Sequence, residues 1–332
     1  MRGEMFLMAA TISCTLTWIG RPEMLFSAKP ERQAIVSGQL AEPVCRKEKS
    51  ASSESALPPP YVPASAQSTG NVTPLPTLSK ESEESHQMIE QELAQIRSQT
   101  VARTYVDGQG KKLLYRLWIP RGYDTKKKYP LILFLHGAGE RGDDNQKQLA
   151  HPDVLHWVRE KYAKEHPSFL AAPQCPAGAK WVDVNWWQMP HHQTPPQPAE
   201  PMRLSMELLD ALQKEFSIDP DRMYVTGLSM GGYGTFDLLV RRPHYFAAAV
   251  PLCGGADDSR AKDFVHVPIW IFHGAQDKAV PVVRSRSIVE ALRKAGGQPR
   301  YTEYPDEGHA IWKRVYADPE LARWLFSQVR PK

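Results

Sequence analysis

The chain has 332 residues, of which 42% are hydrophobic and 23% are charged, and its formal net charge is +4. This length suffices for one large domain with a tail, or for two modest domains. The small charge argues against binding to nucleic acid or to an anionic membrane. The longest basic run, from Lys126 to Lys128, is typical of a solvated turn.

The first 27 residues have the pattern of an export leader. An apolar run extends from Met5 to Ile19, which matches the apolar region of a signal peptide but is too short and too polar for a membrane span. Glu4 reduces the positive charge that is typical of the start of a signal peptide, and no A-x-A cleavage site follows the apolar run. We expect an exported protein that is periplasmic, secreted or lipid-anchored. The alternative is a mis-assigned start codon and a cytoplasmic protein.

Residues 28–95 are predicted to be a disordered linker. Serine and proline are frequent there and large apolar side chains are few, so the segment cannot bury enough surface to offset its chain entropy. Near its end, Ile89, Leu93 and Ile96 follow helical spacing. This spacing predicts a short amphipathic helix over residues 81–99.

From residue 100 to residue 332 the pattern alternates between apolar runs and amphipathic segments. The expected strands cover residues 100–106, 113–119, 130–136, 169–172, 222–226, 246–252, 268–273 and 300–304. The expected helices cover residues 202–216, 230–241, 284–295 and 319–329. Such alternation is typical of an α/β domain with a mainly parallel sheet and helices on both faces. In such sheets the chemistry lies at the carboxyl ends of the strands.

One candidate nucleophile stands at such a strand end. The residues from Gly227 to Gly231 read G-L-S-M-G, with an apolar strand before them and a helix after them. A G-x-S-x-G sequence in this context indicates a nucleophile elbow, a sharp turn that exposes the serine above the sheet. The alternative is a glycine-rich turn without chemistry. We expect Ser229 to be the nucleophile.

A nucleophilic serine needs a histidine base and an acid that orients it. His309 follows the strand at residues 300–304, and Asp277 follows the strand at residues 268–273. The order Ser, Asp, His along the chain is that of α/β-hydrolases, which selects His309 over His273. Asp257 and Asp258 are the alternative acids, and a helix cap or turn is the alternative role for Asp277.

The predicted reaction also needs donors for an oxyanion. The residues after the strand at 130–136 read H-G-A-G, a loop that can supply one backbone amide beside that of the residue after the nucleophile. We assign these amides to Ala138 and Met230.

Three tryptophans lie in a long proline-rich connection between residues 175 and 201: Trp181, Trp186 and Trp187. Long ordered loops are often functional, so these rings are candidates for a wall on which a sugar or aryl group stacks. Packing of the loop against the domain is the equal alternative.

The four cysteines show neither C-x-x-C nor Cys/His metal spacing. We expect no metal and no organic cofactor. For Cys175 and Cys253 we favour buried free thiols over a disulfide.

Five segments together resemble a bacterial α/β-hydrolase esterase family, labelled predicted peptidase or prolyl-oligopeptidase-like and related to feruloyl esterases and polyhydroxybutyrate depolymerases. They read LHGAGERGDDN at 135–145, APQCP at 172–176, YVTGLSMGGYGT at 224–235, WIFHGAQD at 270–277 and YTEYP at 301–305. The resemblance covers residues 100–330. It implies the α/β-hydrolase fold and a triad of Ser229, Asp277 and His309.

The resemblance favours hydrolysis of carboxylic esters over hydrolysis of peptides. We therefore expect a serine carboxylesterase that forms an acyl-enzyme on Ser229 and acts on a small-molecule or carbohydrate ester, such as an ester of a plant or algal polysaccharide. A serine peptidase for small peptides is one alternative. A non-catalytic binding protein on a hydrolase fold is another.

Overall fold

The computed structural model describes residues 80–186 and 191–331. The predicted leader, most of the predicted linker and Trp187 lie outside the described residues. The elements in chain order are α1 (Lys80–Gln99), β1 (Val101–Val106), β2 (Lys112–Trp118), β3 (Tyr129–Leu135), η1 (Ala138–Glu140), η2 (Lys147–Leu149), η3 (Pro152–Val158), α2 (Glu160–Ala163), β4 (Phe169–Pro173), α3 (Glu200–Glu215), β5 (Ile218–Leu228), α4 (Met230–Arg241), β6 (Ala248–Leu252), η4 (Asp258–Arg260), α5 (Ala261–Phe264), β7 (Trp270–Gly274), α6 (Val283–Lys294), β8 (Arg300–Tyr304), α7 (Trp312–Ala317) and α8 (Pro319–Ser327).

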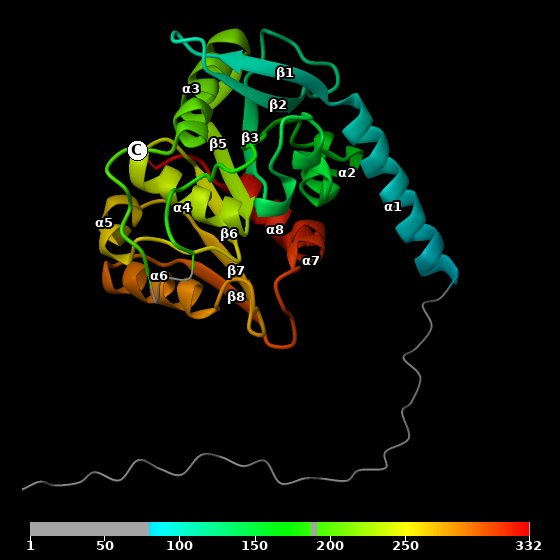
Figure 1. The fold of residues 1–332 in the computed structure, drawn as a ribbon. Coiled ribbons are helices and arrows are strands. Elements are labelled where there is room, and N and C mark those ends of the chain that lie inside the picture. The colour runs from blue at the N-terminus through cyan, green and yellow to red at the C-terminus, as the bar shows by residue number, and fades with distance from the viewer. Residues whose placement is uncertain (1–79, 187–190, 332) are drawn as a thin grey trace, which may run out of the picture. The chain divides into compact units, whose positions relative to one another are not determined.

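The strands form one eight-stranded sheet in the order β1-β2-β4-β3-β5-β6-β7-β8 (Figure 1). β1 pairs with β2, and β2 with β4, in antiparallel register. Every other neighbouring pair is parallel. The predicted fold class, a mainly parallel sheet with helices on both faces, is confirmed.

Each face of the sheet has its own hydrophobic core, because successive side chains of a strand point to opposite faces. In β3, Leu131, Leu133 and Leu135 pack with α3, α4, α5 and α6. Ile132 and Phe134, which alternate with them, pack with α1, η3, α7 and α8. All seven residues of β3 are buried, which explains why its sequence is a continuous apolar run rather than an alternating one.

The helix α1 belongs to this compact unit rather than to the linker. Leu93 and Ile96 are almost completely buried in the same core as η3, and Arg159 donates a hydrogen bond of 2.8 Å to Glu92. The helix was predicted from the sequence, but residues up to 95 were assigned to the disordered linker. The ordered domain therefore begins before residue 100, because the apolar stripe of the helix is buried against η3.

Candidate active site

Ser229 lies at the sharp turn between β5 and α4. Its φ of 55° and ψ of −118° belong to a region that residues other than glycine rarely adopt, at a cost of about 1–3 kcal/mol. The turn is fixed by the Ser229 amide, which donates a hydrogen bond of 2.9 Å to the carbonyl of Leu252 in β6.

The glycines of the motif are required by close backbone contacts. A Cβ atom on Gly231 would lie 1.8 Å from the Leu135 carbonyl oxygen, and one on Gly227 would lie 2.3 Å from the Gly231 carbonyl oxygen. Such contacts are sterically forbidden, so β3, β5 and α4 can meet this closely only where these side chains are absent.

His309 and Asp277 are joined directly. His309 follows β8 and Asp277 follows the adjacent β7. The His309 Nδ1 atom lies 2.7 Å from Asp277 Oδ2, which leaves Nε2 as the ring nitrogen that can exchange a proton with another group.

Asp277 is held by several further donors. Its Oδ1 atom accepts hydrogen bonds from the amides of Ala279 and Val280 at 2.8 and 2.9 Å, and His273 Nε2 lies 3.2 Å from Oδ2. Burial alone would raise the pKa of this carboxyl group. The hydrogen bonds from His273, His309 and Val280 outweigh that effect and hold the pKa well below its usual value.

His273 also contacts the carboxylate of Asp277. Its Nε2 atom faces both Asp277 Oδ2 and the Val280 carbonyl at 2.9 Å, so this nitrogen carries the proton and Nδ1 accepts from the Ser285 hydroxyl at 2.7 Å. Cys253 completes a buried trio with His273 and Asp277. The Cys253 thiol donates to the His309 carbonyl at 3.3 Å, and burial raises its pKa well above the usual value, so it is a neutral thiol.

The loop after β3 is shaped by a buried histidine. His136 Nε2 accepts from the Cys175 amide at 2.9 Å, and Nδ1 therefore donates to the Gly137 carbonyl at 2.6 Å. Burial lowers the pKa of His136 to about 4, so the ring is neutral. This bridge positions Ala138, which begins η1, just as Met230 begins α4. First-turn amides have no partner within their own helix.

These groups surround one cavity of about 420 Å³. Its lining includes Ser229, His309, Ala138 and Met230, together with Trp186, Trp312, Glu140 and His151. The Trp312 ring lies edge-on to His309 with a centroid separation of 5.8 Å. His151 Nε2 lies 3.7 Å from Glu140 Oε1 at the same cavity. The arrangement joins a strained serine and a carboxylate-oriented histidine at a space sized for a small organic group.

The tryptophans occupy different environments. Trp186 is half-buried and lines the cavity. Trp181 is fully buried, and its Nε1 atom donates to the His136 carbonyl at 3.0 Å. A stacking role does not fit Trp181, because no part of its ring is accessible; it packs against the loop that carries Ala138. Trp312 lines the cavity but was not among the predicted residues. It lies outside the tryptophan cluster and belongs to no recognised motif.

The alternative acids are engaged elsewhere. Asp257 accepts from the amides of Ser259 at 3.1 Å and Thr194 at 2.6 Å. Asp258 hydrogen-bonds to Ser287 and lies 3.3 Å from His191. Cys175 and Cys253 are both buried free thiols, as the sequence favoured.

The fold and the cavity define an α/β-hydrolase. Residues 123–318 match the model of the phospholipase/carboxylesterase family, and the chain belongs to this family of hydrolases.

Individual relatives agree with that membership. The chain is 25% identical to a probable feruloyl esterase C of Aspergillus niger over 203 residues, which cover 60% of this chain and 68% of the relative. It is 28% identical to a bifunctional acetylxylan esterase/xylanase of Neocallimastix patriciarum over 148 residues, which cover 45% of this chain and 19% of that protein.

Among solved structures, a thermostable esterase is 39% identical, with a TM-score of 0.66 over 71% of this chain and 64% of the other. The chain thus spans about two thirds of the length of this esterase and of the Aspergillus protein. In the part of the chain that the structure describes, no helix has both the length and the apolar character of a membrane span.

Proposed function

We propose that this protein is a serine carboxylesterase in which Ser229 is the nucleophile, His309 the general base and Asp277 the orienting acid. The observation that carries the proposal is the 2.7 Å hydrogen bond between His309 and Asp277 beside the cavity that Ser229 lines. A serine hydroxyl is activated by a general base that accepts its proton, and the base is oriented by an acid.

The proposed reaction has two acyl-transfer steps. Ser229 Oγ attacks the ester carbonyl carbon while His309 Nε2 takes the hydroxyl proton. The Ala138 and Met230 amides donate to the resulting oxyanion. The C–O bond to the alcohol then breaks, and the alcohol leaves with the proton from His309. Water, deprotonated by His309, attacks the acyl-enzyme, and the carboxylic acid departs as Ser229 regains its proton.

For the substrate we propose esters carried by plant or algal polysaccharides. Trp186 and Trp312 give the cavity two aromatic walls, and aromatic rings suit stacking against a sugar or an aryl acyl group. The names of the relatives, feruloyl esterase and acetylxylan esterase, agree with substrates of this kind. A panel of feruloyl, acetyl and short aliphatic esters, with a matched amide for each, would separate this proposal from peptidase activity.

The decisive test replaces the nucleophile. Ser229→Ala should abolish hydrolysis of a short p-nitrophenyl ester and labelling by a fluorophosphonate probe, while circular dichroism shows an intact fold. Ser327→Ala, at an exposed position in α8, is the matched control and should keep full activity. Undiminished turnover by Ser229→Ala would exclude the assignment. Failure of the unaltered protein to react with the probe would favour a non-catalytic binding protein.

The proposal extends to the location of the enzyme. Residues 1–27 are proposed as an export leader from the sequence alone. The part of the predicted 28–95 linker that precedes α1, residues 28–79, is proposed as a tether to the catalytic domain. N-terminal sequencing of the protein recovered from cell fractions would test both. A full-length chain confined to the cytoplasm would contradict export.

A further inference from the structure

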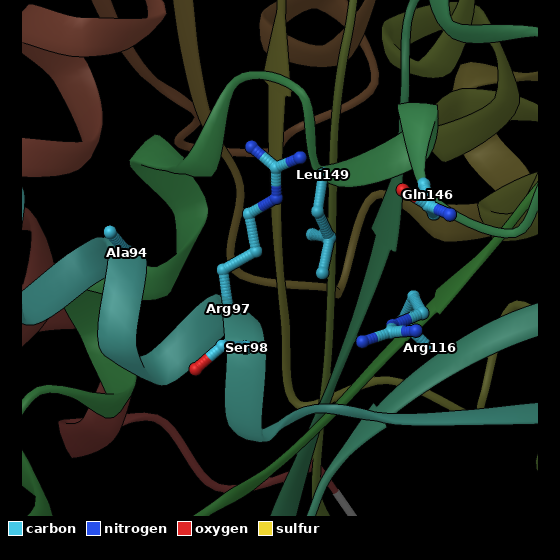
Figure 2. A pocket seen from close by; sticks show the side chains of 6 residues that line it. All are labelled: Ala94, Arg97, Ser98, Arg116, Gln146 and Leu149. Carbon is cyan, nitrogen blue, oxygen red and sulfur yellow. The ribbon is translucent and has the colours of Figure 1, made fainter.

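A second cavity, of about 280 Å³, lies where α1, β2 and η2 meet. It is lined by Ala94, Arg97 and Ser98 of α1, Arg116 of β2, and Gln146 and Leu149 at η2 (Figure 2). None of these residues lines the active-site cavity. Figure 2 shows the two arginines reaching the pocket from different elements, with Gln146 across from Arg97.

The two arginines carry charge that no carboxylate neutralises within residues 80–186 and 191–331. Most arginines of the domain are paired, as Arg103 is with Glu215 at 2.8 Å and Arg159 with Glu92 at 2.8 Å. Arg116 instead donates to the hydroxyl and carbonyl of Thr100 at 2.9 and 2.7 Å. These two bonds fix the guanidinium and leave other N–H groups unused, since arginine has five.

The two positive charges act on one another. Burial lowers the pKa of the Arg116 guanidinium, and the charge of Arg97 lowers it further. Arg97 lies in the last turn of α1 and is exposed, so it is free to turn toward a ligand. An anion between the two guanidinium groups would replace this repulsion with charge-assisted hydrogen bonds.

The rest of the lining suits the same ligand. The side-chain amide of Gln146 can donate from the opposite wall, while Ala94 and the buried Leu149 supply an apolar surface. A cavity with basic and amide donors over an apolar base fits an oxyanion that carries a small apolar group. The volume admits inorganic phosphate or a short organic carboxylate.

We propose that this pocket is a binding site for a small oxyanion, held by the guanidinium groups of Arg97 and Arg116 and by the Gln146 amide. Gln146 and Leu149 belong to the segment that begins at Glu140 and ends at His151, both of which line the active-site cavity. An anion bound here would therefore contact α1, β2 and the segment that borders the active site.

The test is a titration of the full chain by calorimetry, with inorganic phosphate in one arm and benzoate in the other, at constant ionic strength set by sodium chloride. Saturable binding of either anion is expected. In Arg97→Gln the affinity should fall about tenfold, the effect of losing one charge-assisted contact. Binding of phosphate alone identifies an inorganic or phosphoryl ligand, and preference for benzoate identifies a carboxylate ligand.

Arg293→Gln is the matched control. Arg293 is also exposed and also lies in the last turn of a helix, α6, but it lines none of the cavities described above. This variant should bind like the unaltered protein. Arg97→Gln changes an exposed side chain, so its fold should persist; Arg116→Gln would remove the bonds to Thr100 and is the secondary variant. No saturable binding of either anion, or equal weakening in Arg97→Gln and Arg293→Gln, would overturn the proposal.

Discussion

His309 and Asp277 lie at the ends of adjacent parallel strands, and a hydrogen bond of 2.7 Å joins Nδ1 of one to Oδ2 of the other. The bond spans 32 residues of sequence. It depends on β7 and β8 ending at the same edge of the sheet. The same carboxylate also faces His273, so one imidazole ring from β7 and one from the connection after β8 contact the same acid.

Asp277→Asn should lower kcat on a p-nitrophenyl ester by about 10³- to 10⁴-fold at pH 7, because an amide can donate to His309 and so favour the wrong tautomer. The measurement is steady-state kinetics, with near-UV circular dichroism to verify the fold. Asp257→Asn changes the acid that the sequence left as an alternative and should retain most activity. A severe loss in Asp257→Asn with an active Asp277→Asn would reverse the assignment.

Stability should fall as the pH is lowered from about 6.5 toward 4. Burial lowers the pKa values of His136, His156 and His192 to about 4, whereas the unfolded chain titrates at about 6.5. Between these pH values the unfolded state binds more protons, so each histidine removes up to about 1.4 kcal/mol of stability per pH unit.

Urea unfolding at several pH values between 7.5 and 5 measures this dependence. His156→Asn should reduce the slope of unfolding free energy against pH. Gln87→Asn, at an exposed position in α1 that carries no titratable group, should leave the slope unchanged. Equal stability at pH 7 and pH 5 would contradict the prediction.

Gly231→Ala should destabilise the fold by at least about 3 kcal/mol and remove activity, because its Cβ atom would collide with the backbone of Leu135. Gly108→Ala is the control: a Cβ atom there meets nothing within 4 Å. Thermal unfolding of both variants would show the difference. A Gly231→Ala protein as stable as Gly108→Ala would mean that β3 and α4 are not packed as described.

Two tryptophan variants separate substrate contact from packing. Trp186→Ala should raise KM for an aryl or sugar ester with little change in the melting temperature, because the ring lines the cavity. Trp181→Ala should instead cost about 3–5 kcal/mol of unfolding free energy, since that ring is fully buried. If Trp181→Ala instead raised KM and Trp186→Ala lowered stability, Trp181 would be the substrate contact and Trp186 the packing residue.

Much of the fold could be predicted because its signals are local. The buried runs of β3 and β7 are apolar in sequence and predict strands close to those observed. The predicted strand at residues 222–226 is only part of β5, which extends from Ile218 to Leu228 because its first half is polar and gives no apolar signal. The turn at Ser229 could be predicted for the same reason, since G-x-S-x-G encodes a local backbone shape.

What could not be predicted depends on contacts between distant segments. The docking of α1 requires η3, whose apolar residues follow no regular pattern. The cavity walls combine Glu140 and His151, both from the segment between β3 and β4, with Trp312, which begins α7 near the end of the chain. Trp181 and Trp186 are five positions apart, and nothing local shows that one is buried and the other lines a cavity.

The close contacts of Gly227 and Gly231 have a consequence for how this enzyme can diverge. These two glycines cannot be replaced without moving the backbone segments that they touch, so we expect changes of specificity in the segments that supply Glu140, His151, Trp186 and Trp312. Evolution and laboratory selection should therefore find new substrates by altering these segments while the turn that holds Ser229 stays constant.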